Sequence, residues 1–146
     1  MTHEQFVAFE TAKLAKQAGF DGEVRAHYFE QNGEKAFYHD QIPTGKWNSE
    51  LYDGCFSAST QSVLQRWLRE VKVISVEAYH TIVWVEHDSS LAIKWFYNVC
   101  YLNSNKSDVL SSDEFDTYEA ALEAGLQKCL TLLIENLYPN LKGGEK

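Results

Sequence analysis

The stretch "ASTQSVLQRWLREVKVISVEAYH" (Ala58–His80) combines two hydrophobic periods, and the change from one to the other indicates the fold class. In its first half, apolar side chains recur at the spacing of one helix face: Val63, Leu64, Trp67, Leu68 and Val71. Hydroxyl side chains that suit a helix N-cap precede them: Ser57, Ser59 and Thr60. From Val73, apolar and polar residues alternate, which is the period of a half-buried β-strand. The stretch therefore predicts a helix that leads directly into a strand.

Two further runs downstream favour β-structure, because they are rich in branched and aromatic residues. They are "TIVWVE" (Thr81–Glu86) and "SLAIKWFYNVCYL" (Ser90–Leu102), and "HDSS" (His87–Ser90) joins them like a hairpin loop. With Val73–His80, this makes three predicted strands. The last run is apolar on both faces, so we expect a central strand with helices on one side and a long loop or a partner on the other.

The beginning of the chain predicts another helix. Thr2 and Gln5 fit a capping box, and Gly19 stands where a left-handed residue would end the helix. Because the apolar residues near its start do not form one clean stripe, we allow this helix to begin as late as Ala8.

A β-hairpin is predicted over Glu23–Asp40. Asn32 and Gly33 form its turn, because both residues tolerate the positive φ that a two-residue turn requires. We expect Gln41–Ser57 to be a long loop that either caps the core or serves a function. Its large apolar side chains are Trp47, Leu51, Tyr52 and Phe56.

A long helix is predicted from Tyr118 to about Leu137, with Asp116 or Thr117 as its N-cap and Pro139 as its stop. Its apolar face comprises Tyr118, Leu122, Leu126, Cys129, Leu133 and Leu137. The order of elements is then helix, hairpin, helix, three strands, helix. This order predicts an α+β fold, in which an antiparallel sheet of about four to five strands carries three helices mainly on one face.

Residues 1–138 are expected to form a single α+β domain, and residues 139–146 a flexible C-terminal tail. The 146 residues are 45% hydrophobic, which is typical of a folded domain and excludes a disordered chain. The formal net charge is -8; the first 72 residues contain 8 basic and 10 acidic side chains, and the other 74 contain 5 and 11. An acidic surface keeps a protein soluble or docks a basic partner, whereas it disfavours nucleic acid.

The cysteines and the N-terminus favour a cytoplasmic location. Cys55, Cys100 and Cys129 are an odd set without a disulfide spacing, so we expect free thiols. The sequence "MTHEQFVAFE" has neither the basic nor the apolar region of a signal peptide, and the apolar runs are too short to span a membrane.

Three blocks of the chain resemble small α+β proteins encoded by gut anaerobic bacteria, their phages and mobile elements. The blocks are "FETAKLAKQAGFD" (Phe9–Asp21), "STQSVLQRWLRE" (Ser59–Glu70) and "TYEAALEAGLQKCL" (Thr117–Leu130). Ser59 stands where that family often has a proline, which is a benign replacement at a helix start. The resemblance covers about a third of the chain and coincides with the three predicted helices. It implies a bacterial or phage origin and a cytoplasmic accessory role, and it supplies no catalytic residue.

Polar residues with catalytic or metal-binding chemistry are present, but they lack a recognisable spacing. They are His27, His39, Asp40, Cys55, His80, His87 and Asp88. A zinc site requires three or four converging ligands, and a reactive thiol requires a neighbouring base or cation. Neither arrangement is indicated by the sequence, and no phosphate-binding loop occurs. We therefore assign no catalytic, cofactor or metal residue, and an enzyme with a site built from His39, His80, His87 and Asp88 is the third hypothesis.

The first hypothesis is a small non-enzymatic accessory protein that makes protein–protein contacts or self-associates. Its candidate interaction surface comprises Trp47, Tyr52, Phe56, Arg66 and Arg69. Aromatic side chains and arginines of this kind are enriched at the centres of protein interfaces. The second hypothesis is a nucleic-acid-associated accessory protein of a phage or mobile element, in which Arg66 and Arg69 contact phosphates. The same arginines also suit a solvated helix face.

Overall fold

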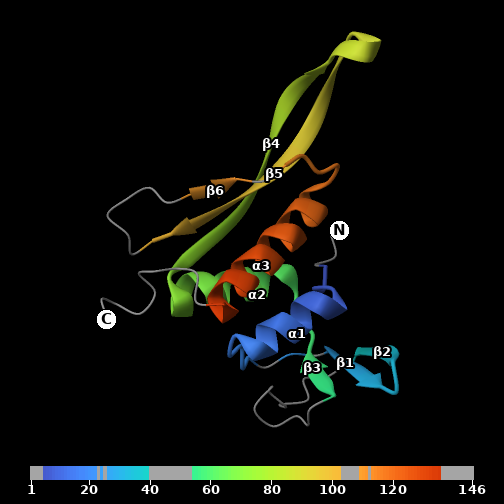
Figure 1. The fold of residues 1–146 in the computed structure, drawn as a ribbon, viewed down its shortest axis with the longest axis vertical. Helices are drawn as coiled ribbons and strands as arrows, with labels where there is room; N and C mark the ends of the chain where they lie inside the picture. The colour runs from blue at the N-terminus through green and yellow to red at the C-terminus, as the bar shows by residue number, and fades with distance from the viewer. Residues whose placement is uncertain are drawn as a thin grey trace.

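The computed structural model describes residues 5–22, 24, 26–39, 54–102, 109–111 and 113–135 (Figure 1). Along the chain, its helices and strands are α1 (Phe9–Gln17), β1 (Ala26–Gln31), β2 (Glu34–His39), β3 (Cys55–Ser57), α2 (Gln61–Trp67), the π-helical turn η2 (Leu68–Lys72), β4 (Ile74–Val85), the 3-10 turn η3 (Glu86–Asp88), β5 (Ser90–Tyr101), β6 (Val109–Ser111) and α3 (Tyr118–Ile134). All strand pairs are antiparallel, so the predicted α+β class is confirmed. The strands form two sheets rather than one, in the orders β2-β1-β3 and β4-β5-β6.

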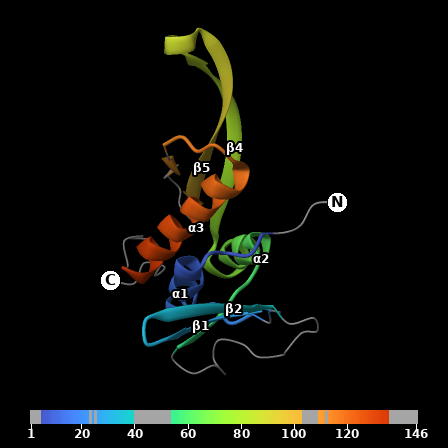
Figure 2. The ribbon, with the colours of Figure 1, turned by 90° about the vertical axis from the view of Figure 1, so that its right-hand side faces the viewer.

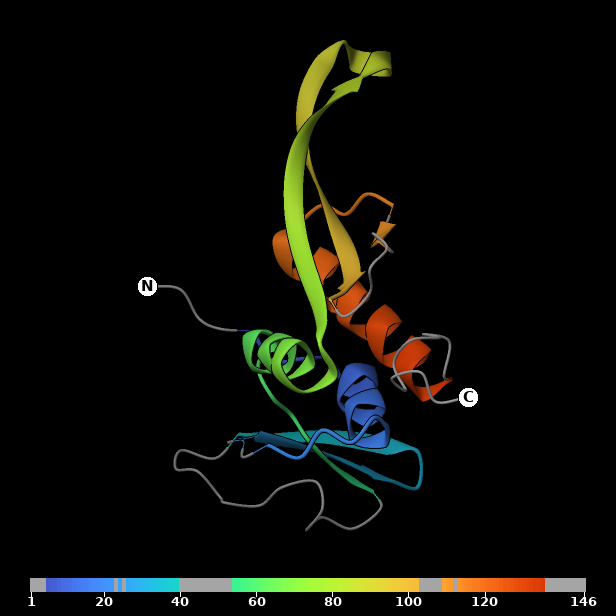
Figure 3. The ribbon, with the colours of Figure 1, turned by 90° about the vertical axis from the view of Figure 1, so that its left-hand side faces the viewer.

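The helices lie between the two sheets (Figure 3). Helix α1 contacts both β3 of the small sheet and α3, while α3 covers one face of β4 and β5. The core side chains that meet in this layer include Leu64, Leu68, Val76, Leu122 and Leu126, each at most 1% exposed. One hydrophobic core therefore holds the helical layer to the β4-β5-β6 sheet.

Helix α1 begins at Phe9, with Ala8 as its N-cap, which agrees with the later of the two predicted starts. Gly19 follows its end with a φ of 101°, in the left-handed region that glycine adopts without strain. Thr2 of the predicted capping box lies outside the described residues. The first turn of α1 is instead capped from another helix, because the backbone N–H of Ala8 donates to the carboxylate of Glu123 over 2.8 Å.

The predicted hairpin is confirmed as β1 and β2. Asn32 and Gly33 have φ values of 54° and 81°, which is the pair of positive values that a two-residue turn of this kind requires. Residues 40–53 of the predicted loop lie outside the described part of the chain. The end of that loop is a strand, because Cys55–Ser57 pairs with β1 as β3.

Helix α2 starts where the hydroxyl caps predicted it. The Thr60 Oγ1 accepts a hydrogen bond from the backbone N–H of Val63 at 3.4 Å. The buried stripe is narrower than predicted: Leu64 and Leu68 are fully buried, but Val63 and Val71 are 43% and 56% exposed. The helix widens into a π-helical turn from Leu68, and the extra residue per turn rotates Val71 away from the core.

The long sheet differs from its prediction in one respect. The segments predicted as two strands, Val73–His80 and Thr81–Glu86, form the single strand β4 of 12 residues. Strand β5 pairs with it in register along its whole length, from Ile74 opposite Tyr101 to Val85 opposite Ser90. Strand β5 is the central strand, as predicted, because the short β6 pairs with its other edge.

Helix α3 has the predicted N-cap, since the Thr117 Oγ1 accepts the backbone N–H of Ala120 at 3.0 Å. Its contact with the sheet depends on Gly125. A Cβ atom at this position would lie 2.9 Å from the Tyr97 ring and 3.0 Å from a methyl group of Val76. The absence of a side chain at Gly125 therefore lets α3 approach β4 and β5 closely.

A carboxylate joins the three helices at their N-terminal ends. Glu123 of α3 accepts hydrogen bonds from the Ala8 N–H, from the Thr11 hydroxyl and, at 2.8 Å, from the Gln61 side-chain amide. Thr11 and Gln61 are buried at 0% and 4% exposure. Because buried donors without partners are costly, this network fixes how the helices meet.

Candidate protein-interaction surface

The hairpin of β4 and β5 extends beyond the rest of the molecule (Figures 1 and 2). Helix α3 covers its lower part only, and the first residue of α3, Tyr118, contacts the Trp95 ring at a centroid distance of 5.5 Å. We name the part beyond this contact, Thr81–Lys94, the arm. A strand of 12 residues spans about 40 Å, whereas a helix of 17 residues spans about 25 Å. Helix α3 is thus too short to cover the hairpin.

One face of the arm is apolar. Its large side chains are Ile82 and Trp84 of β4 and, directly opposite them, Ile93 and Leu91 of β5. These four residues, the apolar arm face, are 62%, 58%, 58% and 66% exposed, respectively. Because side chains alternate along a strand, they lie on the same face as the buried residues that contact α3. The apolar arm face is therefore an uncovered continuation of the core.

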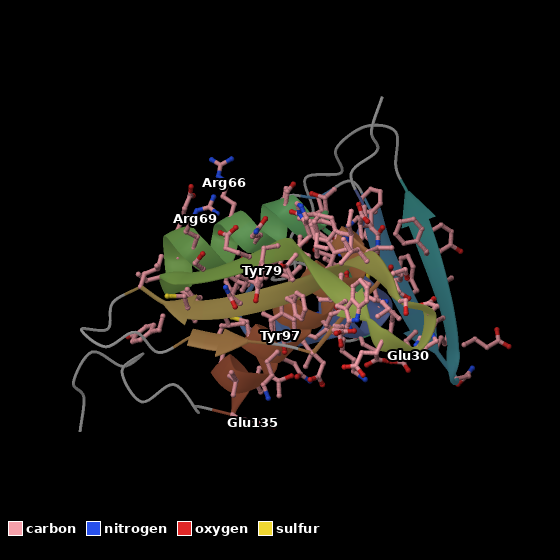
Figure 4. All side chains as sticks on the ribbon, turned by 90° about the horizontal axis from the view of Figure 1, so that it is seen from above. Glu30, Arg66, Arg69, Tyr79, Tyr97 and Glu135 are labelled. Carbon is pink, nitrogen blue, oxygen red and sulfur yellow. The ribbon has the colours of Figure 1, made fainter. Side chains whose placement is uncertain are left out.

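The opposite face of the hairpin is mixed in character. Near the base, Tyr79 stacks on Phe96, with ring centroids 5.5 Å apart and an interplanar angle of 22°. Figure 4 shows Tyr79 and Tyr97 on opposite faces of the hairpin, with Tyr97 on the side of α3. Beyond Tyr79, this face has Thr81, Val83 and Val85 of β4 and, opposite them, Lys94, Ala92 and Ser90 of β5, so its one long side chain is that of the charged Lys94. The apolar arm face is thus the face with the large uncovered side chains.

The tip of the arm is acidic, and its base has an ion pair. Glu86 and Asp88 lie in η3, both exposed, and the Ser90 hydroxyl donates to Asp88 at 3.1 Å. At the base, the Lys94 ammonium donates to Asp116 at 2.8 Å. Lys94 is the one lysine or arginine between Thr81 and Lys94. The arm therefore offers an apolar face that ends in an acidic tip.

The ion pair of Lys94 and Asp116 shifts both pKa values. The hydrogen bond and the charge of Lys94 lower the pKa of Asp116, and the same two effects of Asp116 raise the pKa of Lys94. The pKa of Asp116 is lower in the folded chain than in the unfolded chain. Its contribution to stability is therefore complete at any pH above the pKa that Asp116 has in the unfolded chain. That contribution is lost as pH falls through the lowered value. The Asp116 side chain is 86% exposed, so solvent screening keeps the contribution small.

Replacing Lys94 by Met should raise the pKa of Asp116 towards its ordinary value, because the hydrogen bond and the positive charge are both lost. The side-chain carboxyl signal of Asp116, followed by NMR through an acid titration, measures this shift. Lys13→Met is the matched control, since Lys13 lies 3.9 Å from Glu30 instead. An unchanged Asp116 pKa in Lys94→Met would show that this ion pair does not form in solution.

The residues of the predicted interaction surface lie in different environments. Trp47 and Tyr52 are outside the described residues. Phe56 is 7% exposed and packs edge-to-face on Phe9 at 5.6 Å, so it belongs to the core. Arg66 and Arg69 are exposed and project from α2 and η2 away from the sheet (Figure 4).

Arg66 has a partner within its own helix. Its Nε atom lies 3.1 Å from Glu70, one turn along, and both side chains are more than half exposed. Such pairs contribute a few tenths of a kcal/mol at most. Arg66 is thus held weakly, and both Arg66 and Arg69 are exposed to another molecule.

The histidines and cysteines do not converge in the described part of the chain. No group of three or more His, Cys, Asp or Glu side chains that could hold a metal ion occurs there. His80 contacts the Trp95 ring in the middle of β4, whereas His87 and Asp88 lie at the tip of the arm. The side chain of His39 lies outside the described residues. Cys55 is 1% exposed, which keeps its thiol away from substrates.

The arm was missed by sequence reasoning, although a signal was present. Residues 74–85 and residues 90–101 are two uninterrupted β-patterns of 12 residues each. Both are longer than the predicted last helix could cover. Dividing the first segment at His80 concealed this length. Had the two runs been joined, the excess of strand over helix would have indicated an uncovered apolar face.

Comparisons with known proteins add no relative. The chain matches no protein-family model, no curated protein and no solved structure. None of the helices in the described ranges is both long and apolar enough to cross a membrane.

Proposed function

We propose that the protein is a non-enzymatic accessory protein that binds another protein chain through its arm. The observation that supports this proposal is the apolar arm face. Its four side chains expose on the order of 400 Å² of apolar surface, the size of the largest patch on a typical monomer, and such patches often mark interaction sites. Aromatic and large aliphatic side chains at the centre of a protein interface supply most of its binding energy.

The charges near the arm favour a protein partner over nucleic acid and over an anionic membrane. Phosphate-rich ligands are bound by surfaces on which several lysine and arginine side chains cluster. The tip of the arm has Glu86 and Asp88, and the only cation of the arm is neutralised by Asp116. The cytoplasmic accessory role and the bacterial or phage origin are part of the same proposal, and they rest on the free thiols and on the three helical blocks.

Site-specific photo-crosslinking tests the proposal. A benzophenone side chain at Leu91, on the apolar arm face, should form covalent adducts with protein when the full chain is expressed in its native cells. The matched control is the same group at Glu135, which is also exposed but lies at the far end of α3. Adducts at Leu91 that disappear when Ile93 is replaced by Asp would support the proposal. Equal labelling at both positions, labelling of lipid or nucleic acid, or no adduct at Leu91 would overturn it.

A further inference from the structure

The backbone groups of β4 alternate in direction, and two hydrogen bonds establish which residues face outward. Val73, one residue before the strand, accepts the N–H of Leu102 at 3.0 Å, so its carbonyl points towards β5. The carbonyl of Val76 accepts the Gln65 side-chain amide from α2 at 2.5 Å, so it points away from β5. Since the direction of the backbone groups alternates along an antiparallel strand, the N–H and C=O groups of every even-numbered residue of β4 point away from β5.

Within the described part of the chain, four residues of β4 have an open edge. Beyond Val76, the outward N–H and C=O groups belong to Ala78, His80, Ile82 and Trp84. Among the described residues, β5 is the only strand that pairs with β4, and no other hydrogen bond reaches these four backbones. Strand β4 contains no proline, lysine or arginine, which are the residues that usually protect an edge. This edge is therefore a long, unprotected template for another strand.

We propose that the partner of the arm is a second copy of this chain, whose β4 pairs antiparallel with β4 of the first. This inference rests on the proposed function and specifies its partner. The register that uses all four open residues places Ala78 opposite Trp84 of the second copy and His80 opposite Ile82. The two-fold axis then passes through Thr81. The result is one continuous sheet in the order β6-β5-β4-β4-β5-β6, with an isologous contact that closes after two copies.

The side chains that meet in this register are compatible. On the apolar arm face, the small Ala78 lies beside the large Trp84 of the second copy, and on the other face Tyr79 lies beside Val83. No two like charges are directly opposite each other between Ala78 and Trp84, because this segment contains no charged residue. Aromatic pairs with branched or small residues stabilise neighbouring strands.

Charge complementarity supports the same arrangement. Because the two β4 strands run in opposite directions, the tip of one arm reaches the beginning of β4 in the second copy, where the Gln65 side chain bonds to Val76. The tip contains the exposed acids Glu86 and Asp88. Beside the base of β4, on the side of its open edge, α2 and η2 expose Arg66 and Arg69 (Figure 4). In the symmetric dimer, the acidic tip of each arm therefore meets Arg66 and Arg69 of the other copy. A single chain lacks this contact.

A pair of proline variants tests the edge. Ile82 and Ile93 are directly opposite each other, share the apolar arm face and are 62% and 58% exposed. Each N–H points away from the other strand, towards the β4 edge for Ile82 and the β5 edge for Ile93, so proline removes no ladder hydrogen bond within the hairpin at either position. Sedimentation of the full chain should show a dimer that both variants weaken through the loss of an apolar side chain, and that Ile82→Pro weakens at least about tenfold more than Ile93→Pro, because only Ile82→Pro removes a hydrogen bond between the copies. Equal weakening by both variants would overturn edge pairing, because packing of the apolar faces would then be responsible.

Disulfide trapping tests the register, with Cys100→Ser as the background that removes the half-buried thiol. In the proposed dimer, two Thr81→Cys side chains meet at a non-hydrogen-bonded pair, whose Cα atoms lie about 4.5 Å apart, within the range of a disulfide. Ala92→Cys is the matched control, on the same face but one strand further from the axis. Mild oxidation should produce covalent dimer from Thr81→Cys in several-fold excess over Ala92→Cys.

The outcomes separate the identity of the partner from the existence of a binding surface. Equal trapping of both variants, together with a wild-type chain that sediments as a monomer up to its solubility limit, would overturn the second copy as partner. Photo-crosslinking at Leu91 would still report a different protein on the arm in that case. Absence of both self-association and Leu91 adducts would overturn the proposed function as well.

Discussion

Replacing Leu126 by Ala should lower the free energy of unfolding by about 2–5 kcal/mol, which is the cost of a cavity in a packed core. Leu126 is fully buried in the cluster that joins α3 to the other helices and to β4. The free energy of unfolding of a small domain is about 5–15 kcal/mol, so the variant loses a large share of its stability. Urea or thermal unfolding followed by circular dichroism measures the change.

Leu91→Ala is the matched control, because it deletes the same atoms from a side chain that is 66% exposed at the arm. Its unfolding free energy should stay within about 0.5 kcal/mol of the wild type, as for most surface substitutions. The two variants together separate the core from its uncovered continuation. A large loss for Leu91→Ala in dilute solution would mean that the arm is packed within a single chain, contrary to the structure.

Gly125→Val should destabilise the chain by about 3 kcal/mol or more, because overpacking at a close helix–sheet contact forces backbone shifts. The first atom of any side chain at Gly125 would already lie 2.9 Å from Tyr97 and 3.0 Å from Val76. Neither neighbour has free space behind it, since Val76 is fully buried and Tyr97 packs against the core. Equilibrium unfolding in urea measures the loss.

Replacing Gly125 by Ala makes this test specific, because the expected change in stability has the opposite sign to the one that helix propensity predicts. Gly→Ala in a helix interior normally stabilises by about 1 kcal/mol, whereas Gly125→Ala should destabilise. Ala120→Gly is the control for helix propensity, because Ala120 is an exposed residue of α3, and it should cost only about 1 kcal/mol. If Gly125→Ala proves stabilising, α3 does not approach the hairpin as closely as the structure describes.

Local chemistry made several elements predictable. A threonine hydroxyl caps α2 and another caps α3, because side-chain acceptors satisfy the free N–H groups of a first helical turn. Asn32 and Gly33 determine the turn between β1 and β2 through their tolerance of positive φ. Each of these features depends on a few neighbouring residues, so the sequence contains the whole signal.

Features that depend on distant residues were less predictable. Whether β4 continues through His80 depends on pairing with β5, and the division of strands between two sheets depends on which faces the helices cover. The burial of Phe56 depends on Phe9 and on β1. Tertiary contacts decide these outcomes, and local propensity contains little of that information.

The candidate site illustrates the same limit. Arg66 and Arg69 were selected from their own helix, and the structure gives them a place beside the open edge of β4 that no local pattern contains. The apolar arm face was hidden in a pattern that usually indicates a buried strand. Only the relative lengths of α3 and of the hairpin show that part of this strand pair has no cover within the described chain.

Amide hydrogen exchange along β4, resolved by NMR at low and at high protein concentration, tests the open arm most directly. In dilute solution, the N–H groups of Thr81 and Val83 should be protected by β5, while those of Ile82 and Trp84 exchange as solvent-exposed amides. At high concentration, the exchange of Ile82 and Trp84 should slow to rates near those of Thr81 and Val83. Protection of all four amides at the lowest concentration, or exposure of Ile82 and Trp84 at every concentration, would contradict an open edge that a second copy covers.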